Sequence, residues 1–275
     1  MSIHNYIRCF LGILQREIYR FFQQTGRLLA ALVRPLVWLF VFATGFRNVM
    51  GFPSSPPYTS YVEYDVYITP GLVAMIILFN GMQTSLSMVL DREMGSMKTL
   101  FSSPLPRWFL LTSKLIAGAF VSILQSYAYI LIATLWIYYR LGTAGLPPWE
   151  GYFILLPTLL ICGVALGAMG LFVSSRVRQI ENFAGVMNFF IFPMFFVSTA
   201  LYPFWQIKIS SKVMYGLAYL NPFSHVVELI RFGFYAESNL ESLIWVTCVG
   251  AFFLGCAIWG YDATRGTMVK KVGKS

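Results

Sequence analysis

The strongest constraint on the fold is a pair of long apolar runs that contain no charged residue, from Val66 to Leu90 and from Leu115 to Tyr139. Each can cross a bilayer, because about 20 helical residues at about 1.5 Å per residue span the hydrocarbon layer. Between them lies a short polar island, Asp91 to Lys114, which has the sequence DREMGSMKTLFSSPLPRWFLLTSK. The pattern predicts two spanning helices that return the chain to one side of a membrane through this island.

The composition supports a membrane protein with many spans. Apolar residues make up 57% of the chain and charged residues only 11%, whereas soluble domains carry about 25% charged residues. The net charge of +9 could suggest nucleic acid as a partner, but the basic residues lie between apolar runs and not on one face, so no nucleic acid is expected. The arginines at 8, 16 and 20 argue against a signal peptide. The four cysteines show no spacing for a disulfide or a metal site and are interpreted as packing residues.

We predict an all-α, polytopic membrane protein in which residues 1–275 form a single transmembrane domain. Residues 1–27 are expected to hold an amphipathic helix at the membrane interface, because the apolar residues between Ile3 and Gln24 recur every three or four positions. This helix could be a simple anchor or could flank a docking surface. Residues 202–241 are too interrupted by charge and proline for a full crossing, and two short re-entrant helices are expected there. The six predicted spans are 28–46, 66–90, 108–139, 152–173, 182–201 and 242–261.

The distribution of basic residues predicts the orientation. The N-terminal segment through Arg34, the polar island Asp91–Lys114, the loop at Arg176 and the C-terminal tail together hold 15 of the 20 Lys and Arg residues. Under the positive-inside rule this asymmetry predicts that both termini are cytoplasmic. In the fourth span, Gly163-x-x-x-Gly167 followed by Gly170 allows close helix approach, either inside the chain or at a dimer contact.

The predicted spans offer no chemistry of their own for catalysis or ion coupling. The interiors of spans two to six contain no acidic, basic or histidine residue, although proton-driven carriers generally use one as a relay. The ending Gly273-Lys274-Ser275 lacks the upstream glycine of a phosphate-binding loop, which would fall at Met268. We therefore expect no metal, no cofactor bound by this chain and no enzymatic activity, and energy for transport would come from another protein.

Two stretches resemble the ABC-2 type permeases, the membrane halves of bacterial ATP-binding-cassette exporters. The first is LDREMGSMKTLFSSP at Leu90–Pro104, and the second runs from Phe192-Pro193 through Tyr202-Pro203 and Asn221-Pro222 to Arg231. Two positions depart from the family pattern: Asp91 stands where Glu is common, and Thr199-Ala200 replaces a frequent Ser-Gly pair. The resemblance covers nearly the whole chain in span number, loop placement and length.

The resemblance implies a homodimer in the bacterial inner membrane that binds two cytoplasmic ABC ATPase subunits, with ATP and Mg held by those subunits. The 91–107 loop would be the coupling loop, and spans two and five would line a path for amphipathic or lipid-like cargo in contact with membrane lipids. The residues implied for ATPase coupling are Asp91, Arg92, Glu93, Gly95, Met97, Lys98, Leu100, Phe101 and Pro104. Those implied for the path are Phe79, Met82, Phe189, Phe192, Met194 and Phe196. Those implied for the external re-entrant helices are Asn221, Pro222, Glu228 and Arg231, with Glu228 and Arg231 expected either to pair or to shape the exit.

Two other functions stay open at this point. A membrane scaffold or assembly factor would share the span pattern without a transport cycle, and a membrane enzyme would show activity as an isolated chain. A gene with Walker motifs next to this one would favour the transporter.

Overall fold

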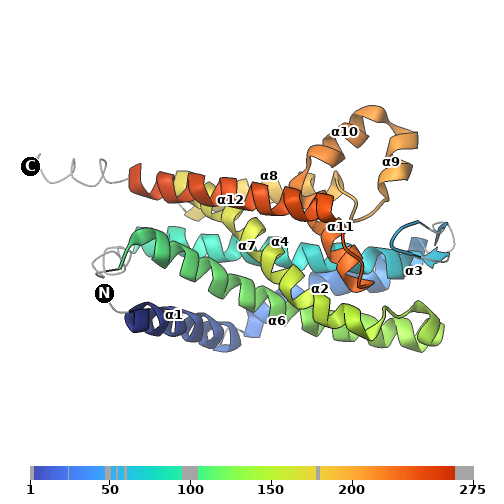
Figure 1. Cartoon of the computed structure of the whole chain (residues 1–275), viewed down its shortest axis with the longest axis horizontal. Coiled ribbons are helices and arrows are strands. Elements are labelled where there is room, and N and C mark those ends of the chain that lie inside the picture. Colours follow the sequence, from blue (N-terminus) through green and yellow to red (C-terminus); the bar gives the residue numbers. More distant parts are fainter. Residues whose placement is uncertain are drawn as a thin grey trace, which may run out of the picture.

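The computed structural model describes residues 3–23, 25–46, 51–53, 55–58, 61–94, 105–177 and 180–263. Most of these residues are helical, as expected for a chain whose backbone must satisfy its own hydrogen bonds in hydrocarbon. The longest helices run side by side along one axis of the molecule (Figure 1). In chain order the elements are α1 (Ile3–Gln23), α2 (Thr25–Val37), η1 (Trp38–Ala43), α3 (Thr44–Phe46), β1 (Gly51–Phe52), β2 (Val62–Glu63), α4 (Tyr64–Glu93), α6 (Arg107–Leu141), η2 (Gly142–Gly145), α7 (Trp149–Arg176), α8 (Ile180–Phe196), α9 (Phe204–Ser210), α10 (Lys212–Leu220), α11 (Pro222–Phe234) and α12 (Leu240–Ala263).

Four helices of the described chain are long and apolar enough to cross a membrane: α4, α6, α7 and α12. They correspond to the second, third, fourth and sixth predicted spans and extend a few residues beyond them at their ends. In its apolar window α4 is 78% buried, whereas α12 is only 22% buried. α4 is therefore the central helix of the bundle, and α12 lies at its edge against α7.

The first and fifth predicted spans are shorter than expected. The apolar part of the first runs from Ala31 to Phe46, and it contains Pro35 and the π-helical turn η1. Proline cannot donate the usual helical hydrogen bond, and π turns are known insertions within α-helices. The fifth, α8, ends at Phe196 and not at 201. A turn follows, in which the Ser198 hydroxyl donates to the carbonyl of Phe195 at 2.6 Å and accepts from the backbone N–H of Ala200 at 3.2 Å. The structure thus has four long spans and two shorter apolar helices, and the six-span count stays a prediction.

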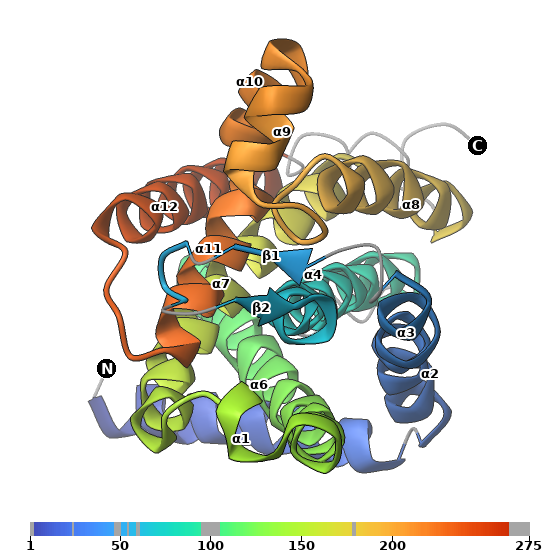
Figure 2. The same cartoon turned by 90° about the vertical axis from the view of Figure 1, so that its right-hand side faces the viewer.

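The segment 202–241 forms three helices where two were predicted. Pro203 precedes α9, and the Ser211 side chain accepts a hydrogen bond from the backbone N–H of Met214 and starts α10. Asn221 caps α11, whose first residue is Pro222, a favourable start for a helix. Local capping therefore divides this segment more finely than its hydrophobic pattern indicates. Between the first two predicted spans the structure also contains an antiparallel pair, β1–β2, visible in Figure 2.

The bundle has two ends, which we name by residues. The Asp91 end carries Asp91, Lys114 and Arg176 at the adjoining termini of α4, α6 and α7, and the Arg140 end carries Arg140, β1, β2 and the helices α9 and α10. Figure 2 looks onto the Arg140 end and shows α1 lying crosswise to the bundle, beneath α6. The described part of α12 finishes at the Asp91 end, the same end at which α1 begins (Figure 1).

Small residues let α7 approach its neighbours closely within the chain. A Cβ added at Gly163 would lie 2.9 Å from the Cβ of Ala119 on α6, and one at Gly170 would lie 2.5 Å from the Oγ of Ser85 on α4. Gly167 faces α6 and also lies against Gly81 of α4. Of the two predicted uses of this glycine pattern, the structure shows packing inside the chain.

Candidate functional site

A buried ion pair closes the base of the polar island. The Lys114 ammonium on α6 lies 2.7 Å from a carboxylate oxygen of Asp91 on α4, and the Lys114 side chain is only 3% exposed. An ammonium without a partner is costly away from water, so this pair fixes the last turn of α4 against the first turns of α6. The two helices are therefore joined at the base of the loop that connects them.

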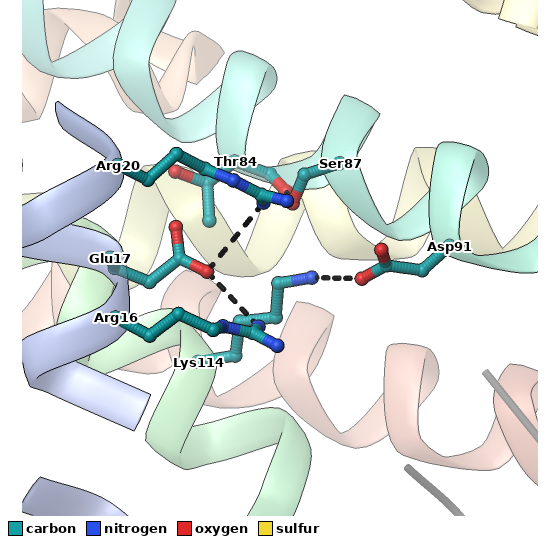
Figure 3. Close-up of polar contacts among 7 residues, drawn as sticks. All are labelled: Arg16, Glu17, Arg20, Thr84, Ser87, Asp91 and Lys114. Carbon is teal, nitrogen blue, oxygen red and sulfur yellow. Dashed lines mark hydrogen bonds and ion pairs between the residues drawn. The ribbon is translucent and has the colours of Figure 1, made fainter. Parts of the chain in front are cut away.

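Helix α1 brings a second charged cluster to the same end. Glu17 is buried and accepts a hydrogen bond from Arg16 at 3.2 Å, while Arg20 lies 4.0 Å from the same carboxylate oxygen. Figure 3 shows these three side chains beside the Lys114–Asp91 pair. The ring of Tyr6 also meets that of Phe109 on α6 edge to face, at 4.9 Å. α1 therefore packs against α6 at this end, and its two predicted roles, simple anchor and flank of a docking surface, both stay predictions.

Three polar pairs hold α4 and α6 in one antiparallel register. Asp91 pairs with Lys114 at one end, the side-chain amides of Asn80 and Gln125 bond in the middle, and Asp65 pairs with Arg140 at the other end. From Asp91 to Asn80 and on to Asp65, the pairs lie about three and then about four turns apart on α4. Their partners Lys114, Gln125 and Arg140 are separated by the same numbers of residues on α6, in the opposite chain direction. The Arg140 guanidinium also donates to Glu63 on β2 at 2.6 Å. α4 and α6 are thus joined as a hairpin from end to end.

The middle pair is the feature that sequence analysis missed. Asn80 and Gln125 are 3% and 1% exposed, and both lie inside runs without charge. A search for acidic, basic or histidine residues passes over amides, although an interhelical amide bond in hydrocarbon contributes about 1 kcal/mol. The sequence does contain a sign of this pair, because Asn80 precedes Asp91 by as many residues as Gln125 follows Lys114.

The remaining residues predicted for ATPase coupling are described only in part. Arg92 and Glu93 complete the last turn of α4, and only their backbone is described. The other predicted members lie outside the described residues: Gly95, Met97, Lys98, Leu100, Phe101 and Pro104. The coupling role of this loop therefore stays a prediction.

The predicted path residues separate into two groups. Phe79 and Met82 on α4 are buried inside the chain, with the Arg34 guanidinium over the Phe79 ring at 3.7 Å. They pack within the single chain and do not reach its surface. By contrast, α8 presents exposed aromatic side chains, with Met194 partly buried among them. The exposed members are Phe189 at 76%, Phe192 at 50% and Phe196 at 50%.

At the Arg140 end, Arg231 ties α11 to the turn that follows α8. Its guanidinium donates to the carbonyl of Thr199 at 2.8 Å, pairs with Glu228, and lies over the ring of Tyr67 with Cζ 4.1 Å from the centroid. The Tyr67 hydroxyl donates to the same carbonyl at 3.0 Å. Burial raises the pKa of the nearby Tyr58 to about 12, although the Arg231 charge opposes this shift, so the phenol stays neutral at physiological pH. The predicted pairing of Glu228 with Arg231 is present.

Asn221 makes a second link between the same elements. Its Oδ1 accepts from the backbone N–H of Phe223 at 3.0 Å and so caps α11. Its Nδ2 donates to the carbonyl of Met194 in the last turn of α8 at 2.8 Å and to that of Val197, the residue after α8, at 2.6 Å. One side chain thus satisfies the end of one helix and the start of another, which gives this Asn-Pro pair a physical role.

The fold and these two ends define a multi-pass helical membrane protein. Residues 8–235 match the family of ABC-2 type transporters, and the chain belongs to that family. The family comprises membrane subunits of transporters and implies a partner ABC ATPase in general.

Several curated relatives agree with this assignment. The chain is 27% identical over 191 residues to the probable multidrug ABC transporter permease YbhR of Escherichia coli K12, covering 68% of this chain and 48% of that protein. It therefore spans about half the length of this relative. It is 25% identical over 231 residues to the putative transport permease ycf38 of Pyropia yezoensis, covering 83% of this chain and 75% of that one. It is also 21% identical over 204 residues to nodulation protein J of Sinorhizobium fredii, covering 74% and 72%.

Proposed function

We propose that this chain is the permease subunit of an ATP-driven exporter for amphipathic or lipid-like cargo. In this proposal a separate ABC ATPase docks on the 91–107 loop, binds the ATP and Mg, and supplies the work. The observation that carries the proposal is the buried Lys114–Asp91 pair at the base of this loop. Because it joins α4 to α6 where the ATPase would push, a movement of the loop would move both helices together.

The proposed orientation places the Asp91 end in the cytoplasm of a bacterium, with both termini there and the Arg140 end outside the plasma membrane. The excess of basic residues on the segments of the Asp91 end supports it. Six crossings close this topology if α2–α3 and α8 both traverse the bilayer. A cysteine at Glu150, which is exposed at the Arg140 end, should then react with a membrane-impermeant maleimide in intact cells.

The proposed translocation unit is a homodimer with the α8 aromatic face at its axis. Phenylalanine and methionine offer adaptable apolar contacts without fixed charge, which suits amphipathic cargo. In a variant with the four native cysteines replaced by alanine, Phe189→Cys should form a disulfide between two copies. Phe153→Cys, equally exposed on α7, is the matched control. If both positions crosslink equally, the α8 face is not specifically at a dimer axis, and we would assign it to lipid.

The coupling proposal is tested by co-expressing the chain with an ABC ATPase encoded by a neighbouring gene. The intact chain should retain the ATPase through purification and change its rate of hydrolysis, whereas Leu100→Ala and Glu93→Ala should weaken both effects. Glu150→Ala at the opposite end is the control. A chain that retains the ATPase equally in all variants, with no change in turnover, would favour a scaffold.

A further inference from the structure

The Arg140 end contains a cleft of about 360 Å³ that the coupling and packing described above do not use. It lies between α9, α10, α11, the start of α12 and the segment at Tyr58. Its volume is within the range of small-molecule sites, which usually combine apolar walls with a few polar groups. Figure 2 shows α9 and α10 standing out to one side of the bundle, and the residues that line the cleft come from these two helices and from the neighbouring α11.

The walls of the cleft are rich in aromatic rings. Trp205 on α9 is 38% exposed, and Tyr215 and Tyr219 on α10 have stacked rings with centroids 6.1 Å apart. The faces of such rings carry negative partial charge and attract cations. Two cations of the protein itself already use ring faces in this wall: Arg231 lies over Tyr67, and the Lys208 ammonium lies 5.6 Å from the centroid of Tyr215.

The charges that line the cleft leave one carboxylate uncompensated. Glu228 and Arg231 neutralise each other in an ion pair. Glu241, in the first turn of α12, is exposed and accepts a hydrogen bond from the Tyr219 hydroxyl at 2.7 Å, and within the described part of the chain it forms no ion pair. The lining residues therefore carry one more negative than positive charge, and the Lys208 ammonium lies beside them on the Tyr215 ring.

Several hydrogen-bonding groups in the cleft are occupied by the protein, whereas the Tyr58 hydroxyl and the Arg231 Nε are buried in its lining without a hydrogen bond in the described part of the chain. The Tyr219 hydroxyl is bound to Glu241, the His225 ring nitrogen Nε2 lies 2.8 Å from the carbonyl of Tyr219, and Arg231 is bound to Glu228 and Thr199. A neutral ligand rich in hydroxyl groups would have to compete with the bonds that Tyr219, His225 and Arg231 already make. An organic cation needs only ring faces and an uncompensated carboxylate.

We propose that this cleft binds an organic cation, held by the rings of Trp205, Tyr215 and Tyr219 and by the charge of Glu241. Under the orientation proposed above, the cation would occupy the outer end of the transporter. The inference rests on the proposed function in one respect: a transporter of amphipathic cargo would bring such a ligand to the cleft. Binding itself needs neither nucleotide nor ATPase, so it can be measured independently of coupling.

The test uses the full chain in lipid nanodiscs without ATP, with tetraphenylphosphonium as the probe and equilibrium dialysis as the measurement. Empty nanodiscs correct for partitioning of the probe into lipid. Glu241→Gln, which keeps an acceptor for Tyr219, should weaken binding roughly 3- to 10-fold, and Trp205→Leu should weaken it to a similar extent. Glu150→Gln, an equally exposed acid on α7, should leave binding unchanged. Neutral triphenylphosphine oxide should bind more weakly than the cation.

A variant with the opposite effect guards against simple misfolding. Lys208→Gln removes a positive charge that competes for the Tyr215 ring, so it should tighten binding of the cation roughly two- to threefold. The proposal is overturned if the neutral analogue binds as tightly as the cation, or if Glu241→Gln and Lys208→Gln both bind like the wild type. If the cation binds as expected while Leu100→Ala leaves ATPase coupling intact, the failure belongs to the coupling proposal and not to the cleft.

Discussion

Lys114 and Asp91 are 23 positions apart in the chain, yet their charged groups lie 2.7 Å apart across the base of the polar island. Removing either partner alone takes the ion-pair partner away from the other charge, whereas replacing both with apolar residues removes the cost of burying charge. We therefore expect Lys114→Ala to lower the stability by about 3 kcal/mol, and Asp91→Leu/Lys114→Leu to regain most of it. Thermal unfolding of the purified chain in detergent measures both.

The same pair offers a test of its role in coupling. If the double variant is stable and still retains the ATPase, the pair has no role in coupling, and each residue serves only to neutralise the charge of the other. The exposed Lys212, for which no contact is described, is the control position, and Lys212→Ala should unfold like the wild type. Additive effects of the two single substitutions would contradict a direct interaction.

The amide pair in the middle of the hairpin predicts a different pattern. Asn80→Leu alone leaves the Gln125 carbonyl oxygen without its donor in a buried place, which costs about 1–3 kcal/mol. Asn80→Leu/Gln125→Leu should be closer to the wild type, because no polar group is then left unpaired. A double-mutant cycle on thermal stability measures the coupling, and a value near zero would mean that the two amides are not bonded.

Gly71 on α4 is the clearest test of close packing. A Cβ added there would lie 2.8 Å from the Cα and from the carbonyl oxygen of Ala200, and these backbone atoms cannot rotate away. Gly71→Ala should therefore destabilise the chain by about 1–3 kcal/mol and disturb the turn after α8. Gly216→Ala on α10, where a Cβ meets no atom within 4 Å, is the matched control and should be neutral or slightly stabilising.

Arg231 should be replaceable neither by an apolar residue nor by lysine. Arg231→Met leaves the largely buried Glu228 without its counterion and should cost about 3–5 kcal/mol. Arg231→Lys keeps the charge but loses the planar fork that reaches Glu228 and the Thr199 carbonyl together, so an intermediate loss is expected. Limited proteolysis of the segment from α9 to α11 reports whether it has come loose. Wild-type resistance in Arg231→Met would show that the contacts are dispensable.

Much of the fold follows from the sequence because hydrocarbon permits few structures. The uncharged runs predict α4, α6, α7 and α12 correctly, and the pairing of Glu228 with Arg231 follows from their spacing of three residues on one helix. The third helix in the segment 202–241 was missed because it depends on the caps Ser211 and Asn221, which act on single N–H groups. Likewise, the burial of Phe79 and Met82 depends on which face of α4 meets its neighbours, and a helix that is apolar all round does not reveal this.

The register of the α4–α6 hairpin has an evolutionary consequence. Inserting or deleting one residue between Asp65 and Asp91 would rotate every later side chain on α4 by about 100° and separate pairs that now meet. The same holds between Lys114 and Arg140. Length changes in homologous genes should therefore be rare within these two helices, and where they occur in one helix a compensating change should appear in the other.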